Sequence, residues 1–166
     1  MAILVTPLRR LSSDYGRILH STNICNDLTG ELMTELITRK PIIIIVIDDD
    51  PSILRALRRL VSGAGFEVWT FDRPSALLKS DLPETGACLI VDIDLPEMNG
   101  VELCATLAGS GCKLPVILIT AHTDEETRKL ADDAHPVALL IKPFGRDLLV
   151  NTIETALERG KSPQSD

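Results

Sequence analysis

Polar residues directly follow four apolar segments of this 166-residue sequence. Asp48 and Asp49 follow IIIIVI, Asp92 follows CLIV, Thr120 ends VILIT and Lys142 follows VALLI. Each has an ordinary explanation, because acids cap helices, threonine suits strands and lysine suits solvated turns. The sequence contains five such apolar segments, and four of them end in or are followed by these polar residues. This frequency favours a shared site over separate ordinary roles.

The chemistry that these residue types support is phosphoryl transfer to a carboxylate. Carboxylates crowded together repel one another, so at least one pKa rises unless a cation neutralises them. Mg²⁺ prefers oxygen ligands and typically pairs one or two carboxylates with phosphate oxygens. Lys142 and the Thr120 hydroxyl would then contact the remaining phosphoryl oxygens. We predict that Asp92 is the nucleophile, because its strand is central and continues into a loop able to hold the metal.

The elements that must position these residues alternate between strands and helices from Pro41 onward. Runs rich in β-branched residues predict strands, and apolar residues at helical spacing predict helices. The alternation predicts an α/β fold, a doubly wound five-stranded parallel sheet with helices on both faces. Ligands of such sheets bind outside the carboxyl ends of the strands. Strands are predicted over 42–47, 66–71, 88–92, 116–120 and 137–141, and helices over 51–64, from 74, and over 99–108, 124–134 and 146–159.

Composition and charge exclude several classes of protein. With 45% apolar but only 3% aromatic residues, the core must consist of Ile, Leu, Val and Ala. A net charge of −7 would repel phosphate backbones and anionic lipid, so we expect no direct DNA binding and no membrane partner. The four cysteines form no CxxC motif, which indicates reduced thiols and a cytoplasmic location.

The sequence predicts three parts. Residues 1–40 form a leader without strong periodicity, in which Asp27 to Thr38 has the spacing of a short helix. An alternative is that translation starts at Met33. Residues 41–159 form the predicted domain, and residues 160–166 form a flexible tail.

Four segments together resemble the receiver domain of two-component response regulators. They are IIVIDDDPS, LIVDIDLPEMNG, ILITAH and LLIKPF, and the resemblance extends from Pro41 to about Arg159. It implies a flavodoxin-like fold with strand order 2-1-3-4-5.

The resemblance also implies roles for the residues at the strand ends. Asp92 corresponds to the phosphoacceptor, and Asp48 and Asp49 hold Mg²⁺ together with it. The backbone carbonyl of Asp94 completes the protein ligands of the metal. Thr120 is the switch hydroxyl, and Lys142 contacts the phosphoryl group.

Two further positions bear on the lifetime of the phosphoryl group. Asp94 and His122 lie two residues after the acceptor and the switch hydroxyl, and in receiver domains such positions flank the path of the hydrolytic water. The alternative interpretation is that both are solvated loop residues.

The sequence departs from the family pattern in two places. Leu139 stands three residues before Lys142, where the family usually has an aromatic residue that reports the position of the switch hydroxyl. His135 and Pro136 replace a turn that usually contains glycine. In the family the output surface consists of the fourth helix, fifth strand and fifth helix, and here Leu139 belongs to it. We therefore expect the switch to order the loop from Thr120 to Glu125 rather than to turn a ring inward.

Parts of this pattern also occur in two other kinds of protein. A phosphohydrolase of the haloacid dehalogenase type also has an Asp-x-Asp motif, as in Asp92 to Asp94, but places it on the first strand and has a cap insertion. A degenerate receiver would act only as a binding module, although the acids, Thr120 and Lys142 are all present.

The resemblance implies partners rather than a turnover enzyme. The phosphoryl donor would be a histidine kinase or a histidine phosphotransfer protein, and the output a downstream protein or a second copy. We expect a stand-alone receiver, whose only chemistry is its own phosphorylation and dephosphorylation.

Overall fold

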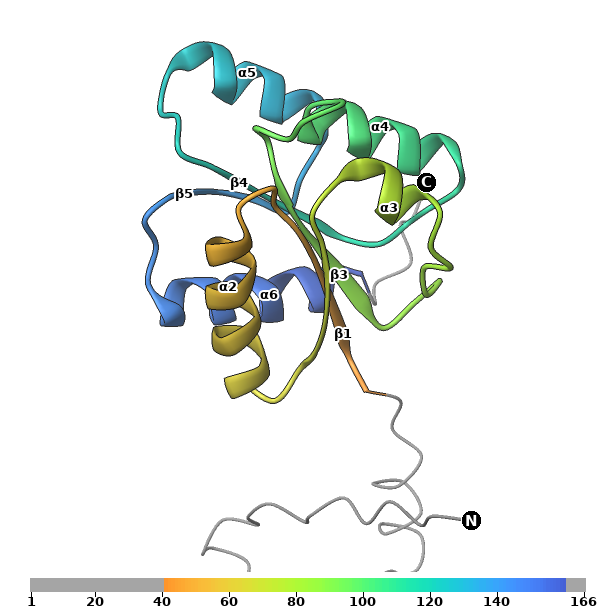
Figure 1. The fold of residues 1–166 in the computed structure, drawn as a ribbon, viewed down its shortest axis with the longest axis vertical. Coiled ribbons are helices and arrows are strands. Elements are labelled where there is room, and N and C mark those ends of the chain that lie inside the picture. Colours follow the sequence, from red (N-terminus) through yellow and green to blue (C-terminus); the bar gives the residue numbers. More distant parts are fainter. Residues whose placement is uncertain (1–40, 161–166) are drawn as a thin grey trace, which may run out of the picture. The chain divides into compact units, whose positions relative to one another are not determined.

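A computed structural model describes residues 41–160, and they form a five-stranded parallel sheet in the order β2-β1-β3-β4-β5 (Figure 1). This confirms the predicted fold and strand order. The observed ends of the elements differ from the predicted ones by at most one residue. The strands are β1 (Ile43–Ile47), β2 (Glu67–Phe71), β3 (Ala87–Asp92), β4 (Val116–Thr120) and β5 (Ala138–Ile141). The helices are α2 (Pro51–Gly63), α3 (Pro74–Leu78), α4 (Gly100–Gly109), α5 (Glu125–Asp133) and α6 (Arg146–Arg159).

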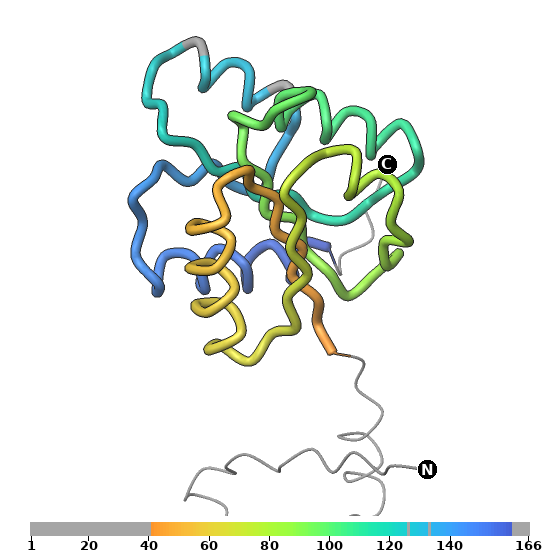
Figure 2. Tube along the Cα trace, viewed as in Figure 1, coloured from red at the N-terminus to blue at the C-terminus, as the bar shows by residue number. Residues whose placement is uncertain are grey.

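Helices cover both faces of the sheet. Figures 1 and 2 show α2 and α6 on one face, and α3, α4 and α5 on the other. Successive side chains of a strand point to opposite faces. Ile44 and Val46 of β1 therefore pack in the cluster beneath α2 and α6, whereas Ile45 and Ile47 pack in the cluster beneath α3, α4 and α5. Burial on both faces explains why this strand is a continuous run of β-branched residues.

The strand register brings the polar residues to one edge of the sheet. Ile47 of β1 pairs with Val91 of β3, so Asp48 and Asp92 follow at the same level. Thr120 of β4 pairs with Ile141 of β5, the residue before Lys142. The carboxyl ends of four neighbouring elements thus meet, as parallel pairing requires.

Side-chain caps begin α2 and α4, the helices that follow β1 and β3. Asp50 accepts a hydrogen bond of 2.7 Å from the backbone N–H of Ser52, and Pro51 occupies the first turn of α2. Asn99 and Glu102 form a reciprocal capping box at the start of α4. These caps end the loops that follow β1 and β3 at defined residues.

The described cysteines, Cys88, Cys104 and Cys112, are free. Cys88 and Cys104 are buried, and burial raises the pKa of each thiol to about 12. Within residues 41–160, no helix has the length and apolar character needed to span a membrane. The predictions for Cys25, for the leader and for residues 161–166 lie outside the described residues.

Candidate phosphoacceptor site

Three carboxylates gather at the carboxyl ends of β1 and β3. Oxygen atoms of Asp48, Asp49 and Asp92 all lie within 4.8 Å of one another. Asp48 is fully buried and Asp92 is 4% exposed, whereas Asp49 faces solvent. Buried carboxylates need compensating charge or hydrogen bonds, so this cluster requires cations.

Lys142 supplies one of these cations. Its Nζ lies 2.7 Å from Oδ2 of Asp48 and 3.0 Å from Oδ2 of Asp92, and it donates a hydrogen bond to each. Burial lowers the pKa of Lys142, but the bonds to Asp48 and Asp92 outweigh that effect and leave it raised. The lysine therefore stays protonated and bridges two of the three acids.

Asp92 retains one oxygen without a partner. Its Oδ1 is buried and has no hydrogen-bond partner among the described residues. Burial is the main cause that raises the pKa of Asp92, Asp48 and Asp94 raise it further, and Lys142 opposes them. An unpaired carboxylate oxygen next to two other acids fits a hard divalent cation, so the residues present suit Mg²⁺.

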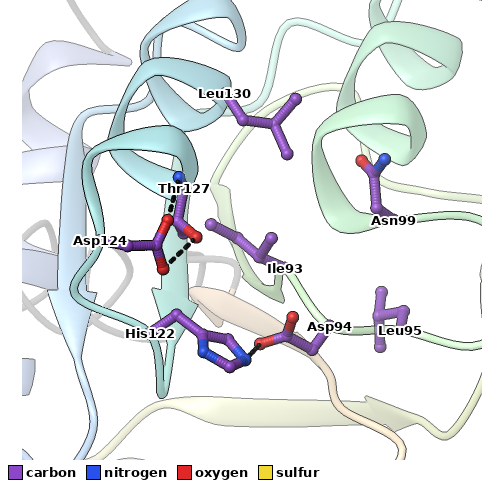
Figure 3. Close-up of a pocket in the computed structure, with 8 residues that line it drawn as sticks. All are labelled: Ile93, Asp94, Leu95, Asn99, His122, Asp124, Thr127 and Leu130. Carbon is purple, nitrogen blue, oxygen red and sulfur yellow. Dashed lines mark hydrogen bonds and ion pairs between the residues drawn. The ribbon is translucent and has the colours of Figure 1, made fainter.

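The Thr120 hydroxyl forms hydrogen bonds with two residues outside the three-carboxylate cluster. Thr120 is fully buried; its Oγ1 donates to Oδ2 of Asp94 over 3.4 Å and accepts from the backbone N–H of His122 over 3.0 Å. Nε2 of His122 lies 3.6 Å from the same Asp94 oxygen (Figure 3). The two residues predicted to affect phosphoryl lifetime are therefore in contact with each other.

An open groove of about 520 Å³ lies beside this pair, between α4 and α5. Figure 3 shows His122 and Asp94 at one end of the groove and Leu130 of α5 at the other. Asp124, which caps α5 through Thr127, also lines it. The groove makes the Asp94–His122 pair accessible from solvent.

The loop between β3 and α4 is held by contacts that the sequence did not predict. Glu97 has a left-handed φ of 73° and accepts hydrogen bonds from the backbone N–H and the hydroxyl of Ser75, at 3.1 and 3.2 Å. Gly100 lies against the backbone carbonyl of Asp92, where a Cβ atom would clash. These contacts fix the path of the loop beside Asp92. The residues from Pro96 to Gly100 indicated a loop. No local sequence pattern indicates that Glu97 bonds to Ser75, which lies 22 residues away in sequence.

The two departures from the family pattern occupy defined positions. Leu139 is half-buried and packs against the apolar cluster beneath α3, α4 and α5. His135 adopts a left-handed φ of 47° between α5 and β5. A histidine thus takes the backbone conformation for which glycine is the usual residue.

Comparison with protein families adds independent evidence. Residues 44–154 match the response regulator receiver domain. The chain is 33% identical to the response regulator protein TmoT of Ectopseudomonas mendocina over 129 residues, which are 78% of this chain and 59% of that protein. It spans between about half and three-fifths of the length of the curated relatives it matches first.

Solved structures agree. The response regulator StyR is 37% identical, with a TM-score of 0.67, and the match covers 73% of this chain and 61% of that one. The structure described as FixJ-N has 27% identity and a TM-score of 0.67, with 75% and 99% of the two chains covered.

Proposed function

Because this chain belongs to the receiver-domain family of response regulators, we propose that it accepts a phosphoryl group on Asp92 within a two-component phosphorelay. One observation carries the proposal. Lys142 holds Oδ2 of Asp92 at 3.0 Å, while Oδ1 has no partner among the described residues. The acid is thus anchored and still offers a free lone pair. Neither the phosphohydrolase nor another turnover enzyme is favoured by this family membership.

The proposed step is the transfer of a phosphoryl group from a phosphohistidine. A carboxylate oxygen of Asp92 attacks phosphorus, and an acyl phosphate P–O bond forms as the P–N bond to the donor imidazole breaks. The bonding electron pair returns to the imidazole nitrogen, which takes a proton from solvent. The donor is a histidine kinase or a histidine phosphotransfer protein, because these are the proteins that the family implies.

The other charged groups of the site assist this step. Lys142 orients Asp92 and offers an ammonium group to a phosphoryl oxygen. Asp48, Asp49 and Asp92, with the backbone carbonyl of Asp94, are the groups that would hold Mg²⁺. When bound, that ion neutralises charge on the transferring phosphoryl oxygens.

The switch that we propose begins at Thr120. Its hydroxyl would leave Asp94 and donate to a phosphoryl oxygen, and the loop that follows it would become ordered. The output surface comprises α5, β5 and α6, with Leu139 beneath it. A downstream protein or a second copy would bind there, and we expect no direct DNA binding by residues 1–166.

Incubation with acetyl phosphate and Mg²⁺, followed by intact mass measurement, tests the proposal. We expect one phosphoryl adduct on the wild-type chain, no adduct in EDTA, and none on Asp92→Asn. The control Asp81→Asn changes an exposed acid outside the site and should leave the adduct unchanged. No adduct on the wild type would indicate a degenerate receiver, and multiple turnover of phosphate esters would indicate a phosphohydrolase.

A further inference from the structure

The loop between β3 and α4 contains Asp94, whose backbone carbonyl belongs to the proposed metal site. Backbone hydrogen bonds fix the two ends of this loop. The N–H of Ile93 donates to the carbonyl of Ile119 in β4 over 2.9 Å, and the N–H of Gly100 donates to the carbonyl of Ile93 over 2.9 Å. The position of residues 94–99 therefore depends on the contacts that their side chains make with the rest of the domain.

Glu97 connects the middle of this loop to helix α3, which lies on the same face of the sheet as α4 (Figure 1). Its Oε2 accepts a hydrogen bond from the backbone N–H of Ser75 over 3.1 Å, and its Oε1 accepts one from the Ser75 hydroxyl over 3.2 Å. Ser75 is the second residue of α3, where backbone N–H groups have no partner inside the helix. In the part of the chain that the structure describes, the side chain of Arg73 at the N-cap position supplies none. Glu97 thus caps α3 from 22 residues further along the chain.

The backbone of Glu97 also indicates a specific use for this side chain. Its φ of 73° lies in the left-handed region, which glycine adopts readily and other residues adopt rarely. Such conformations persist where surrounding contacts hold them, and they are concentrated at functional sites. Leu95 and Met98, on either side of Glu97, pack against the apolar cluster beneath α3, α4 and α5. The two hydrogen bonds to Ser75 account for a glutamate at a position that suits glycine.

We propose that Glu97 is a positioning residue of the Asp92 site and that, through its contact with Ser75, it holds the Asp94 carbonyl in place for Mg²⁺. The inference rests on the proposed metal site. Glu97 is exposed and is not a member of the three-carboxylate cluster, so it acts through the loop and not as a ligand of the metal. The start of α3 thereby becomes part of the support of the phosphoacceptor site.

The Glu97–Ser75 contact should affect the binding of Mg²⁺ more than the binding of Ca²⁺. Mg²⁺ requires nearly ideal octahedral geometry with ligands at about 2.0–2.1 Å, whereas Ca²⁺ accepts flexible arrangements with ligands at about 2.3–2.6 Å. A loop that moves more freely would therefore lose affinity for Mg²⁺ first. A general loss of folded structure would instead weaken the binding of both ions alike. The ratio of the two dissociation constants distinguishes a positioning role from a purely structural one.

Calorimetric titration of the full-length chain with Mg²⁺ and with Ca²⁺ tests the proposal. Glu97→Gly removes the contact and suits the left-handed backbone. It should raise the Kd for Mg²⁺ by about tenfold, the low end of the effect of residues that orient metal ligands, and should raise the Kd for Ca²⁺ less. Glu97→Gln keeps an oxygen that accepts from the N–H of Ser75, so it should bind Mg²⁺ as the wild type does. Adding Ser75→Ala to Glu97→Gly should cause no further loss, because both changes remove the same contact.

Glu84→Gly is the matched control, because Glu84 is an exposed acid in the loop before β3, at the opposite end of that strand from Asp92. It should leave both dissociation constants unchanged, and circular dichroism checks that each variant is folded. The proposal is wrong if Glu97→Gly leaves the ratio of the two constants unchanged, or if Glu97→Gln weakens Mg²⁺ binding as much as Glu97→Gly does. A wild-type chain that binds no Mg²⁺ would overturn the proposed metal site together with this inference. Wild-type binding that none of the variants changes would overturn the inference alone.

Discussion

The hydroxyl of Thr120 donates its hydrogen bond to Asp94, over 3.4 Å, and not to the Lys142–Asp92 pair. His122 contacts both residues, through its backbone N–H to Thr120 and through Nε2 near Asp94. The proposed switch hydroxyl therefore starts from a position defined by the two residues that we expect to affect lifetime.

Removal of either side chain should change how long the phosphoryl group survives. Asp94 is a carboxylate beside the proposed acceptor and is able to orient a water molecule as a general base. Asp94→Ala and His122→Ala should each lengthen the half-life more than twofold, as measured by loss of the phosphoryl adduct over time. Asp81→Ala is the control at a distant exposed acid. Half-lives within twofold of the wild type would show that both are solvated loop residues without this role.

Asp49→Ala should weaken Mg²⁺ binding and slow phosphorylation together. Asp49 is the exposed member of the three-carboxylate cluster, so its truncation leaves the buried Asp48–Lys142 bond in place. We expect the Mg²⁺ concentration for half-maximal phosphorylation to rise by about tenfold or more, since even indirect ligand partners have effects of that size. Calorimetric titration of Mg²⁺ provides a second measurement. Asp132→Ala is the control. If Asp49→Ala has the same Mg²⁺ dependence as this control, Asp49 does not belong to the proposed metal site.

Beryllofluoride, a phosphoryl mimic, should order the loop after β4. With Leu139 in place of an aromatic ring, the movement of Thr120 has no ring to turn, so the response should appear in the backbone that follows it. Amide hydrogen exchange should slow in residues 120–125 and at the adjoining end of β5. Changes confined to residues around the proposed metal site would contradict this mode of switching.

His135→Gly should stabilise the domain. A φ of 47° places the histidine in the left-handed region, which costs a residue with a side chain about 1–2 kcal/mol. Glycine avoids this strain but gains freedom in the unfolded chain, so the net gain in unfolding free energy should be at most about 1 kcal/mol. Urea denaturation measures it. Ala105→Gly in the exposed part of α4 is the control and should destabilise the domain by about 1 kcal/mol. Equal decreases of the unfolding free energy in both variants would show that His135 is not strained.

Asp124 should make the stability of α5 dependent on pH. The backbone N–H of Thr127, followed by its hydroxyl, donates to the carboxylate and holds the pKa of Asp124 below its ordinary value of 3.8. A lowered pKa contributes stability that is present above 3.8 and is lost as pH falls through the folded-state pKa. The difference in urea midpoint between wild type and Asp124→Ala should therefore shrink in acid. Asp124→Asn, which caps without titrating, should lack this trend.

The sequence by itself was sufficient to predict the elements and the residues at their ends. The run Ile42 to Ile47 indicated a buried strand, and the acids after it marked the carboxyl edge of a sheet. Asp50 and Pro51 indicated the start of α2 in the same way. Such signals depend on side chains only a few residues apart, so they can be recognised in the sequence without a tertiary structure. The strand order, by contrast, came from resemblance to a family.

Only the tertiary structure decided how the site residues contact one another. Lys142 bonds to Asp48 and Asp92, which lie 94 and 50 residues away in sequence, because β5, β1 and β3 end at one edge of the sheet. The direction of the Thr120 hydroxyl and the bond from Ser75 to Glu97 were likewise absent from any local pattern. These contacts depend on the pairing register and on which rotamer the surrounding packing permits. Residue types and spacing therefore predict which groups meet, and the packed fold determines which atoms bond.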